Sequence, residues 1–447
     1  MSTMWNSRTK ERIMKVIVIG AGNAGLVAAE KLARGGLDVS VFEKNAYENL
    51  SYDWHDDVNA AAFTENNLPM PKEGTYFTKK NWSFIPPAER VEVTLHILEE
   101  KLDLSTERRS LAQQYVDRAD GVDFRFSSPV DSLIIKENKV VGITSGGKEY
   151  FADLVIDNSG ALSPFRASLP KEWGITPMPD KSEIFVAYRG FHKKLAGVSD
   201  PENSNRAYPK HLGKDGISWS ILDPAGTVNV LIGRQGELTD EAFDEAYSAL
   251  KASNPEISDE VVRGGFKCVI PIRYPLSKMV WDGYVALGDS AFMTIPMIGS
   301  GIENGMKAAV ELADVILKTK SSKKEDLWAY EVTYYKKRGA DHVGVDVLKR
   351  WLLAAKPSDL DWLFEKGVVD EKNMADAATG HLIVLSFPEL LQKVKRGFTR
   401  LPLLLRMNDM LMRAKRAVAL GRKIPSSYDE DKISSWRAKI EKTVYGK

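Results

Sequence analysis

The sequence predicts an α/β fold that is α+β overall, and three observations support this. An apolar run at Lys15–Ile19, helix-forming residues over Ala24–Arg34 and a second apolar run at Val39–Phe42 predict a strand–helix–strand unit of the usual length. Short apolar segments separated by turn residues follow through the middle of the chain, as is typical of sheets. From Asp326 onward the pattern is almost entirely helical.

The other elements can be assigned in chain order. Residues Tyr47–Pro87 are predicted to be irregular, and helices are expected over Ala88–Leu102 and Thr106–Ala119. A long helix is expected over Ile302–Lys318. The predicted strands are Phe124–Phe126, Val130–Lys136, Lys139–Thr144, Tyr150–Ile156, Ser182–Lys193, Ser218–Leu222, Thr227–Arg234, Gly265–Ile272 and Tyr284–Leu287.

Composition excludes several classes of protein. The chain has 447 residues, 62 basic and 61 acidic, and its net charge of +1 gives no indication of nucleic-acid binding. Cys268 is the only cysteine, so no intrachain disulfide or cysteine-rich metal site is expected, and a reducing cytoplasmic location fits. Residues Met1–Arg12 do not resemble a signal peptide, and no apolar stretch is long enough to predict a transmembrane helix.

A glycine-rich turn follows the first predicted strand. Gly20 permits the turn, Gly22 permits close approach of a pyrophosphate, and Gly25 permits tight packing of the helix on the strand. The N-terminus of that helix faces the phosphates with its positive end. Glu43 ends the second strand, where a carboxylate accepts hydrogen bonds from ribose hydroxyls. This Rossmann-like pattern predicts dinucleotide binding, whereas a lone glycine turn would indicate only tight packing.

Two further motifs follow predicted strands. The first runs from Asp157 to Arg166, and on its own it is equally typical of an ordinary turn. The second contains Gly288-Asp289 and a later glycine turn at Gly299-Ser300-Gly301 that opens the helix at Ile302. Asp289 can hold a ribityl hydroxyl, and the helix start can face a flavin ring, although a helix-capping turn would have the same sequence.

Together, the three motifs resemble the FAD-binding fold shared by para-hydroxybenzoate hydroxylase and geranylgeranyl reductase. The resemblance implies FAD binding and a Rossmann-like FAD-binding domain (13–170 and 276–340), interrupted by a β-sheet substrate domain (171–275) and followed by a helical C-terminal region (341–447). Arg108 matches an arginine that such proteins place near the pyrophosphate. The other matching residues are Gly20, Gly22, Gly25, Glu43, Gly160, Ser163, Arg166, Gly288, Asp289, Pro296, Gly299, Gly301 and Ile302.

Two segments are more similar to the geranylgeranyl reductase branch than to the hydroxylases. Phe292 stands where the hydroxylases carry a histidine, and Cys268–Met279 is similar to the Ile-Pro segment of the reductases. This implies an FAD-dependent oxidoreductase that reduces a carbon–carbon double bond of a hydrophobic, isoprenoid-type substrate by hydride transfer from flavin N5. The electron donor would be NAD(P)H or a protein. An NAD(P)H- and O2-dependent monooxygenase acting on an aromatic substrate and an electron-relay flavoprotein remain alternatives.

Candidate catalytic and substrate-lining residues come from polar and aromatic positions. His55 lies in the acidic segment Asp53–Asp57 and is the candidate proton donor, although a solvated loop would look the same. Tyr188, Arg189, Tyr208 and Trp219 are candidates for lining the substrate, and core packing is the alternative for each. Tyr188 and Arg189 are neighbours on one strand, so at most one of them should face a cavity.

The segment Gln392–Lys423 carries ten basic residues and one acidic residue, with apolar residues between them. A basic amphipathic helix of this kind can lie on an anionic membrane surface, which would make the protein peripheral at the membrane. An acidic protein partner, such as a small electron carrier, is an alternative. So is a docked helix whose basic face is simply solvated.

Overall fold

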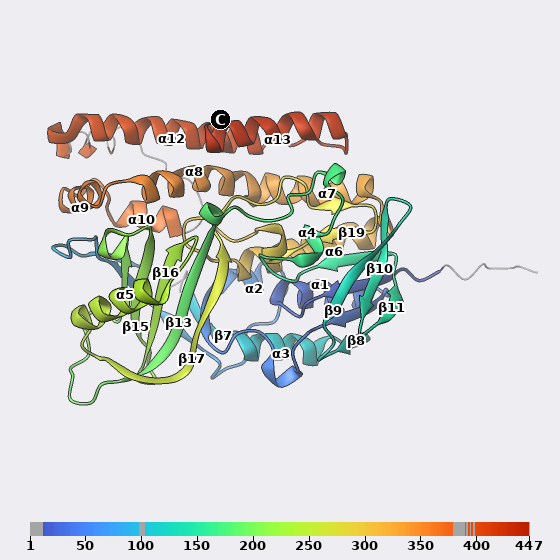
Figure 1. Cartoon of the computed structure of the whole chain (residues 1–447), viewed down its shortest axis with the longest axis horizontal. Coiled ribbons are helices and arrows are strands. Elements are labelled where there is room, and N and C mark those ends of the chain that lie inside the picture. The colour runs from blue at the N-terminus through green and yellow to red at the C-terminus, as the bar shows by residue number, and fades with distance from the viewer. Residues whose placement is uncertain are drawn as a thin grey trace, which may run out of the picture.

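The computed structural model of the chain describes residues 12–97, 103–378, 389, 392, 393, 395, 396 and 398–446. A parallel sheet with its helices forms one half of the molecule and an antiparallel sheet forms the other (Figure 1). Helices of the C-terminal region run as a row along one edge and extend over both halves (Figure 1).

The six-stranded sheet forms around the predicted strand–helix–strand unit. All neighbouring strands pair in parallel, except the antiparallel pair β18–β19. In spatial order the strands are β18 (Val280–Trp281), β19 (Tyr284–Ala286), β12 (Leu154–Asp157), β1 (Lys15–Ile19), β2 (Asp38–Phe42) and β8 (Val122–Arg125). Because β1, β2, β12 and β19 are parallel neighbours, the loops after β1, β12 and β19 meet at one edge.

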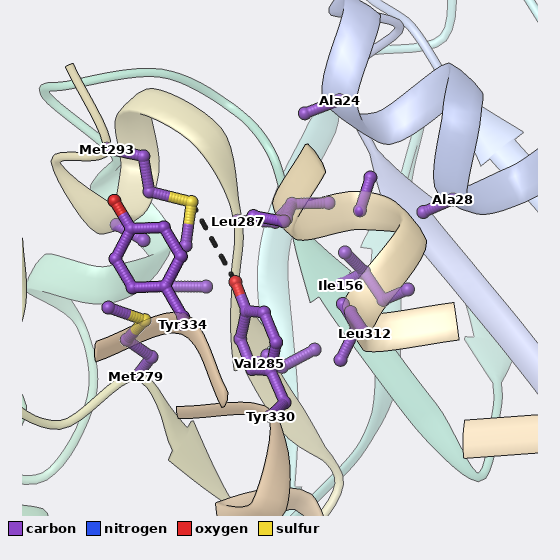
Figure 2. Close-up of a cluster of buried hydrophobic side chains, with 14 of the residues drawn as sticks. Ala24, Ala28, Ile156, Met279, Val285, Leu287, Met293, Leu312, Tyr330 and Tyr334 are labelled. Carbon is purple, nitrogen blue, oxygen red and sulfur yellow. Dashed lines mark hydrogen bonds between the residues drawn. The ribbon is translucent and has the colours of Figure 1, made fainter. Parts of the chain in front are cut away.

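Helices α1 (Asn23–Arg34), α3 (Arg108–Arg118) and α6 (Ile302–Thr319) pack beside this sheet. Figure 2 shows part of the core, to which Ala24 and Ala28 of α1 and Leu312 of α6 belong; a β-carbon on Gly305 of α6 would lie 3.1 Å from the Ala24 β-carbon. On the other side of the same view, the Tyr330 hydroxyl lies 3.8 Å from the Met293 sulfur. The small residues of α1 allow α6 to lie close, and this fixes the start of α6 beside the glycine turn.

Two three-stranded antiparallel sheets accompany the large sheet. One contains β9 (Val130–Lys136), β10 (Lys139–Ser145) and β11 (Lys148–Phe151). The other has β7 (Asp103–Glu107) between β3 (His55–Asn59) and β4 (Tyr76–Lys79), and the short helix α2 (Ala61–Thr64) lies between β3 and β4 in the chain. Another short helix, α4 (Pro164–Ala167), follows β12.

The second large sheet has seven strands, in the order β17 (Ile257–Pro271), β13 (Ile184–Lys194), β16 (Thr227–Gln235), β15 (Gly216–Leu222), β14 (Asn205–Pro209), β5 (Asn81–Phe84) and β6 (Val93–His96). Helix α5 (Asp240–Ser253) packs on one of its faces. Strands β5 and β6 come from inside the range 13–170, so the chain adds an edge to this sheet before the segment 171–275 begins.

Some local expectations were wrong. Residues 93–96, expected in a helix, form strand β6 because β-branched Val93 and Thr94 pair with β5; residues 98–102 lie outside the described part. The expected strand Tyr150–Ile156 is divided at Asp153, whose side chain accepts a hydrogen bond from the Lys15 backbone N–H at 2.9 Å. The segment Tyr47–Pro87 contains β3, α2, β4 and β5, so it is not irregular throughout.

The C-terminal region is helical, as expected. Helix α7 (Lys324–Tyr334) leads into this region, which contains α8 (Ala340–Ala354), α9 (Pro357–Glu365), α10 (Glu371–Ala378), α12 (Leu401–Gly421) and α13 (Glu430–Tyr445). A β-carbon on Gly421 would lie 2.8 Å from the Ala340 Cα atom, so α12 crosses α8 at close range. Within the described residues, no helix has the length and apolar character needed to cross a membrane.

Candidate functional site

The glycine turn after β1 is tightly enclosed. Gly20 has a φ of +92°, and a β-carbon there would lie 2.7 Å from the Asn158 carbonyl oxygen. A β-carbon on Gly25 would lie 2.7 Å from the Gly20 carbonyl oxygen. Gly22 precedes α1 directly, so the backbone N–H groups at the start of α1 face the turn. This is the geometry that a dinucleotide pyrophosphate requires.

Glu43 lies beside this turn. Its carboxylate accepts hydrogen bonds from the backbone N–H groups of Ala21, at 2.8 Å, and Asn45, at 2.9 Å. The side chain is buried at the end of β2, where the sequence placed it. A buried carboxylate at the rim of the turn fits the ribose-binding role that the sequence predicted for it.

Asn158 joins the three sequence motifs. Its amide nitrogen donates to the carbonyl oxygens of Gly20, at 3.2 Å, and Gly22, at 3.4 Å. Its amide oxygen lies 2.8 Å from the position that a β-carbon on Gly288 would occupy. The sequence did not single out Asn158, although its place directly after β12 at the carboxyl edge of the sheet was a usable signal.

The second motif forms buried hydrogen bonds that connect separate loops. Asp157 is fully buried and accepts hydrogen bonds from the hydroxyls of Ser163, at 2.6 Å, and Tyr284, at 2.8 Å. Arg166 is also fully buried; it donates to the carbonyl oxygens of Ala161, at 2.7 Å, and Ser290. Burial lowers the pKa of Arg166. These contacts tie the second motif to the third motif and hold the loop that contains Gly160.

The third motif places Asp289 at the start of α6. The Thr294 hydroxyl donates to Asp289 Oδ1 at 2.9 Å, and a β-carbon on Gly301 would lie 2.9 Å from the same oxygen. Burial raises the pKa of Asp289. Gly299 has a φ of +71°, and its β-carbon position lies 3.6 Å from Ile270 of β17. The loop that contains Pro296 therefore lies between the parallel sheet and the antiparallel sheet.

Asp56 connects the two halves of the site. One carboxylate oxygen accepts a hydrogen bond from Arg108 at 2.8 Å, and the other accepts one from Arg189 at 2.5 Å. Burial acts to raise the pKa of Asp56, but the charges of Arg189 and Arg108 outweigh it and hold the pKa below its usual value. Arg108 opens α3, and Arg189 belongs to β13 of the antiparallel sheet. One carboxylate thus links the predicted cofactor arginine to the predicted substrate wall.

His55 contacts a second carboxylate nearby. Its Nε2 is 2.6 Å from Glu107 Oε1, and the same carboxylate accepts hydrogen bonds from Arg263 at 2.9 and 3.1 Å. The rings of Phe77 and Phe191 stand edge-on to the imidazole, at centroid distances of 5.2 and 5.3 Å. The His55 side chain is largely buried, so the solvated-loop interpretation of this residue is wrong.

Aromatic side chains from distant segments gather beside Asp56. Tyr52 stacks on Trp54 at 4.4 Å, and Trp54 stacks on Phe266 of β17 at 4.9 Å between ring centroids. Cys268 belongs to the same neighbourhood, where burial raises its pKa to about 11 and the charges of Arg108 and Asp56 also act on it. No sequence signal linked Tyr52 to Phe266, because the pairing of the two sheets brings them together.

The four proposed substrate-lining residues fall on two faces of the seven-stranded sheet. Arg189 and Trp219 both approach the Asn229 side chain, and the guanidinium lies 5.4 Å from the indole centroid. Tyr188 packs on Phe243 of α5, and the Tyr208 hydroxyl donates to Asn254, so both tyrosines belong to the core under α5. The prediction that Tyr188 and Arg189 face opposite sides is confirmed.

Two buried side chains of the site have polar atoms that no other described residue satisfies. Both amide atoms of Asn23, in the first turn of α1, are buried without a hydrogen-bond partner among the described residues. The Nε atom of Arg108 is in the same condition. Buried polar atoms normally have partners, so Asn23 offers hydrogen bonds to a group that fills the turn, and Arg108 offers one to a group beside Asp56.

Comparisons with known proteins agree with this geometry. A family model described as an NAD(P)-binding Rossmann-like domain matches residues 18–57. A digeranylgeranylglycerophospholipid reductase from Sulfolobus acidocaldarius is 24% identical to the chain, over 97% of the chain and 98% of the relative.

Solved structures agree as well. A geranylgeranyl bacteriochlorophyll reductase-like protein from Thermoplasma acidophilum has a TM-score of 0.72 at 18% identity, with 89% of this chain and 99% of that chain covered. A flavin-dependent halogenase has a TM-score of 0.59 at 17% identity, with 96% and 77% covered. The predicted fold class and the predicted resemblance to the geranylgeranyl reductase branch are therefore confirmed.

Proposed function

We propose that this protein is an FAD-dependent oxidoreductase that reduces carbon–carbon double bonds in the isoprenoid chains of a lipid. The similarity to a digeranylgeranylglycerophospholipid reductase over 97% of the chain is the observation that carries the proposal. The enclosed glycine turn and the convergence of three motifs on Asn158 support it. We further propose a cytoplasmic location.

The residues around the turn are suited to hold FAD. Gly20, Gly22 and Gly25 would leave room for its pyrophosphate, Glu43 would accept hydrogen bonds from its ribose, and Arg108 would offset phosphate charge. At the flavin end the binding residues are Gly160, Asp289, Pro296, Gly299, Gly301 and Ile302. When bound, FAD supplies the hydride for the reduction.

The chain's own side chains supply position, exclusion of water and a proton. The exposed rings of Tyr52 and Phe266, with the buried Trp54 stacked against both, form an apolar wall next to Asp56, suited to the hydrocarbon of an isoprenoid chain. Arg189 and Trp219 extend this wall along the sheet. His55, held by Glu107, is the proposed source of the proton at the second carbon of the double bond.

Single-turnover reduction without oxygen tests the proposal. The purified protein, its flavin reduced with dithionite, is mixed with digeranylgeranylglycerophospholipid, and flavin reoxidation and product mass are followed. The wild type should reoxidise with a product gain of two hydrogen atoms per double bond. His55→Gln should slow this step about a hundredfold, whereas His96→Gln, at an exposed position, should leave it unchanged.

A parallel assay, with NAD(P)H as the reductant and with oxygen admitted, separates the alternatives. Rapid flavin reduction by NAD(P)H followed by an oxygenated product would contradict the reductase proposal and favour the monooxygenase. Electron exchange with a protein partner and no change in any lipid would favour the relay. Reduction by NAD(P)H without an oxygenated product would identify the donor and leave the proposal intact.

A further inference from the structure

Helix α12 has two apolar faces, and only one of them is buried. Leu403, Met410, Ala414, Ala417 and Gly421 point into the molecule. Their spacing places them on one side of the helix, against α8, as the outermost row of Figure 1 illustrates. This part of the basic tail is therefore a docked helix.

The opposite side of the same segment is also apolar and faces solvent. Phe398 is 71% exposed, Leu401 50%, Leu405 62% and Met412 54%. Phe398 and Leu405 are the two most exposed large apolar residues in the described part of the chain. The spacing of Leu401, Leu405 and Met412, four and then seven residues, keeps them in one stripe along the helix.

Several basic residues of the tail hold the fold and are not available to a partner. Arg400 pairs with Asp359 at 2.9 Å, and Arg413 donates to the carbonyl oxygens of Thr443 and Val444 at the end of α13. Lys393, which lies before α12, is buried and pairs with Asp370 at 2.7 Å. The count of ten basic residues therefore overstates the charge that the tail presents.

Other basic residues continue the exposed stripe. Lys415, Arg416 and Lys423 are exposed and form no ion pair within the described ranges. They lie on the C-terminal half of α12 and just beyond it, whereas Phe398 precedes the helix, Leu401 and Leu405 lie in its first half, and Met412 lies at its middle. A groove of about 530 Å³ between α12 and α13 brings Lys432 and Lys439 beside Lys423, with Asp431 as its acidic residue.

We propose that the outer face of α12 docks this protein on the surface of an anionic bilayer. Phe398, Leu401, Leu405 and Met412 enter the acyl boundary, and Lys415 and Arg416 contact lipid phosphates, as in helices that lie in the plane of a membrane. The straight outer row in Figure 1 suits a flat surface better than a concave protein partner. The choice of a membrane as the binding partner rests on the proposed function, because a lipid substrate would lie in that membrane.

Co-sedimentation of the full-length protein with vesicles tests this surface. Vesicles of phosphatidylcholine with one third phosphatidylglycerol should bind the wild type, and vesicles of phosphatidylcholine alone should bind it at least tenfold less. The triple variant Leu401→Ser/Leu405→Ser/Met412→Ser should lose binding at least tenfold at any salt concentration. The variant Lys415→Glu/Arg416→Glu should lose it mainly at low salt, because charge attraction is screened at high salt.

Matched controls separate docking from general changes of surface. Val261→Ser/Val262→Ser removes exposed apolar residues from β17, and Lys181→Glu/Lys193→Glu reverses exposed charges elsewhere; both should bind like the wild type. All variants should reduce substrate dispersed in detergent at the wild-type rate, so failure of docking is distinguishable from failure of the proposed function.

Three results would overturn the proposal. One is a wild type that does not sediment with anionic vesicles. Another is binding that survives both the serine and the glutamate variants. The third is a wild-type dimer that the serine variant converts to a monomer, because the stripe would then be an interface between copies of this chain.

Discussion

Replacing Asp56 with asparagine should weaken both folding and cofactor binding. The carboxylate accepts one hydrogen bond from Arg108 and one from Arg189, and the Arg189 side chain is only 6% exposed. An amide keeps one acceptor and turns a donor toward the other arginine. Breaking a buried pair costs about 3–5 kcal/mol. Because the Asp56 side chain is 26% exposed, we expect about 3 kcal/mol, the lower end of that range.

Urea unfolding and FAD titration of the apoprotein measure the two effects. The pKa of Asp56 is held below its usual value, so its contribution is present above the pKa of the unfolded chain, about 3.9, and is lost as the pH falls through the lower folded value. The difference in free energy of unfolding between the wild type and Asp56→Asn should therefore disappear only at acid pH. Asp53→Asn is the matched control, since its arginine contacts are 3.8 and 4.0 Å long. Equal unfolding midpoints for the two variants would refute the reasoning.

Two other substitutions test the site and its support. Asn158→Asp replaces the amide donor to Gly20 and Gly22 with an acceptor, so FAD affinity should fall by about tenfold, or about 1.4 kcal/mol; an unchanged dissociation constant would contradict the role of Asn158. Burial raises the pKa of Glu331 to about 8, so stability that is present below the unfolded pKa is lost as the pH rises toward that value. Glu331→Gln should remove a loss in the free energy of unfolding of about 4 kcal/mol between pH 5 and pH 9, measured by urea unfolding; parallel pH profiles of variant and wild type would exclude this explanation.

The cofactor half of the site could be predicted because its signals are local. Gly20, Gly22, Gly25 and Glu43 lie within one strand–helix–strand unit, and each has a fixed position relative to a predicted strand end. The structure places them around the turn after β1 and at the end of β2, and their role in holding a cofactor stays a prediction. Asn158 was missed although it belongs to the second motif, because its importance depends on side-chain contact with a turn 136 residues or more away.

The substrate half could not be predicted at the same level. Tyr52 meets Phe266 only because β3 and β17 belong to sheets that pack together. The sequence around β6 predicts a helix, because its partner, β5, lies in a segment with no clear pattern. The two apolar faces of α12 could not be separated in sequence, because a buried stripe and an exposed stripe have the same residue types and the same period.

These two halves meet at Asp56, and this has a consequence for how substitutions should be interpreted. A change at Asn158 acts on the turn alone, since its contacts all lie within the three motifs. A change at Asp56 releases Arg108 on the cofactor side and Arg189 on the substrate side together. A substitution at Asn158 should therefore change cofactor affinity without changing substrate turnover, whereas a substitution at Asp56 should change both together. In a double variant, the two free-energy changes should be non-additive only where the two replaced residues share a partner.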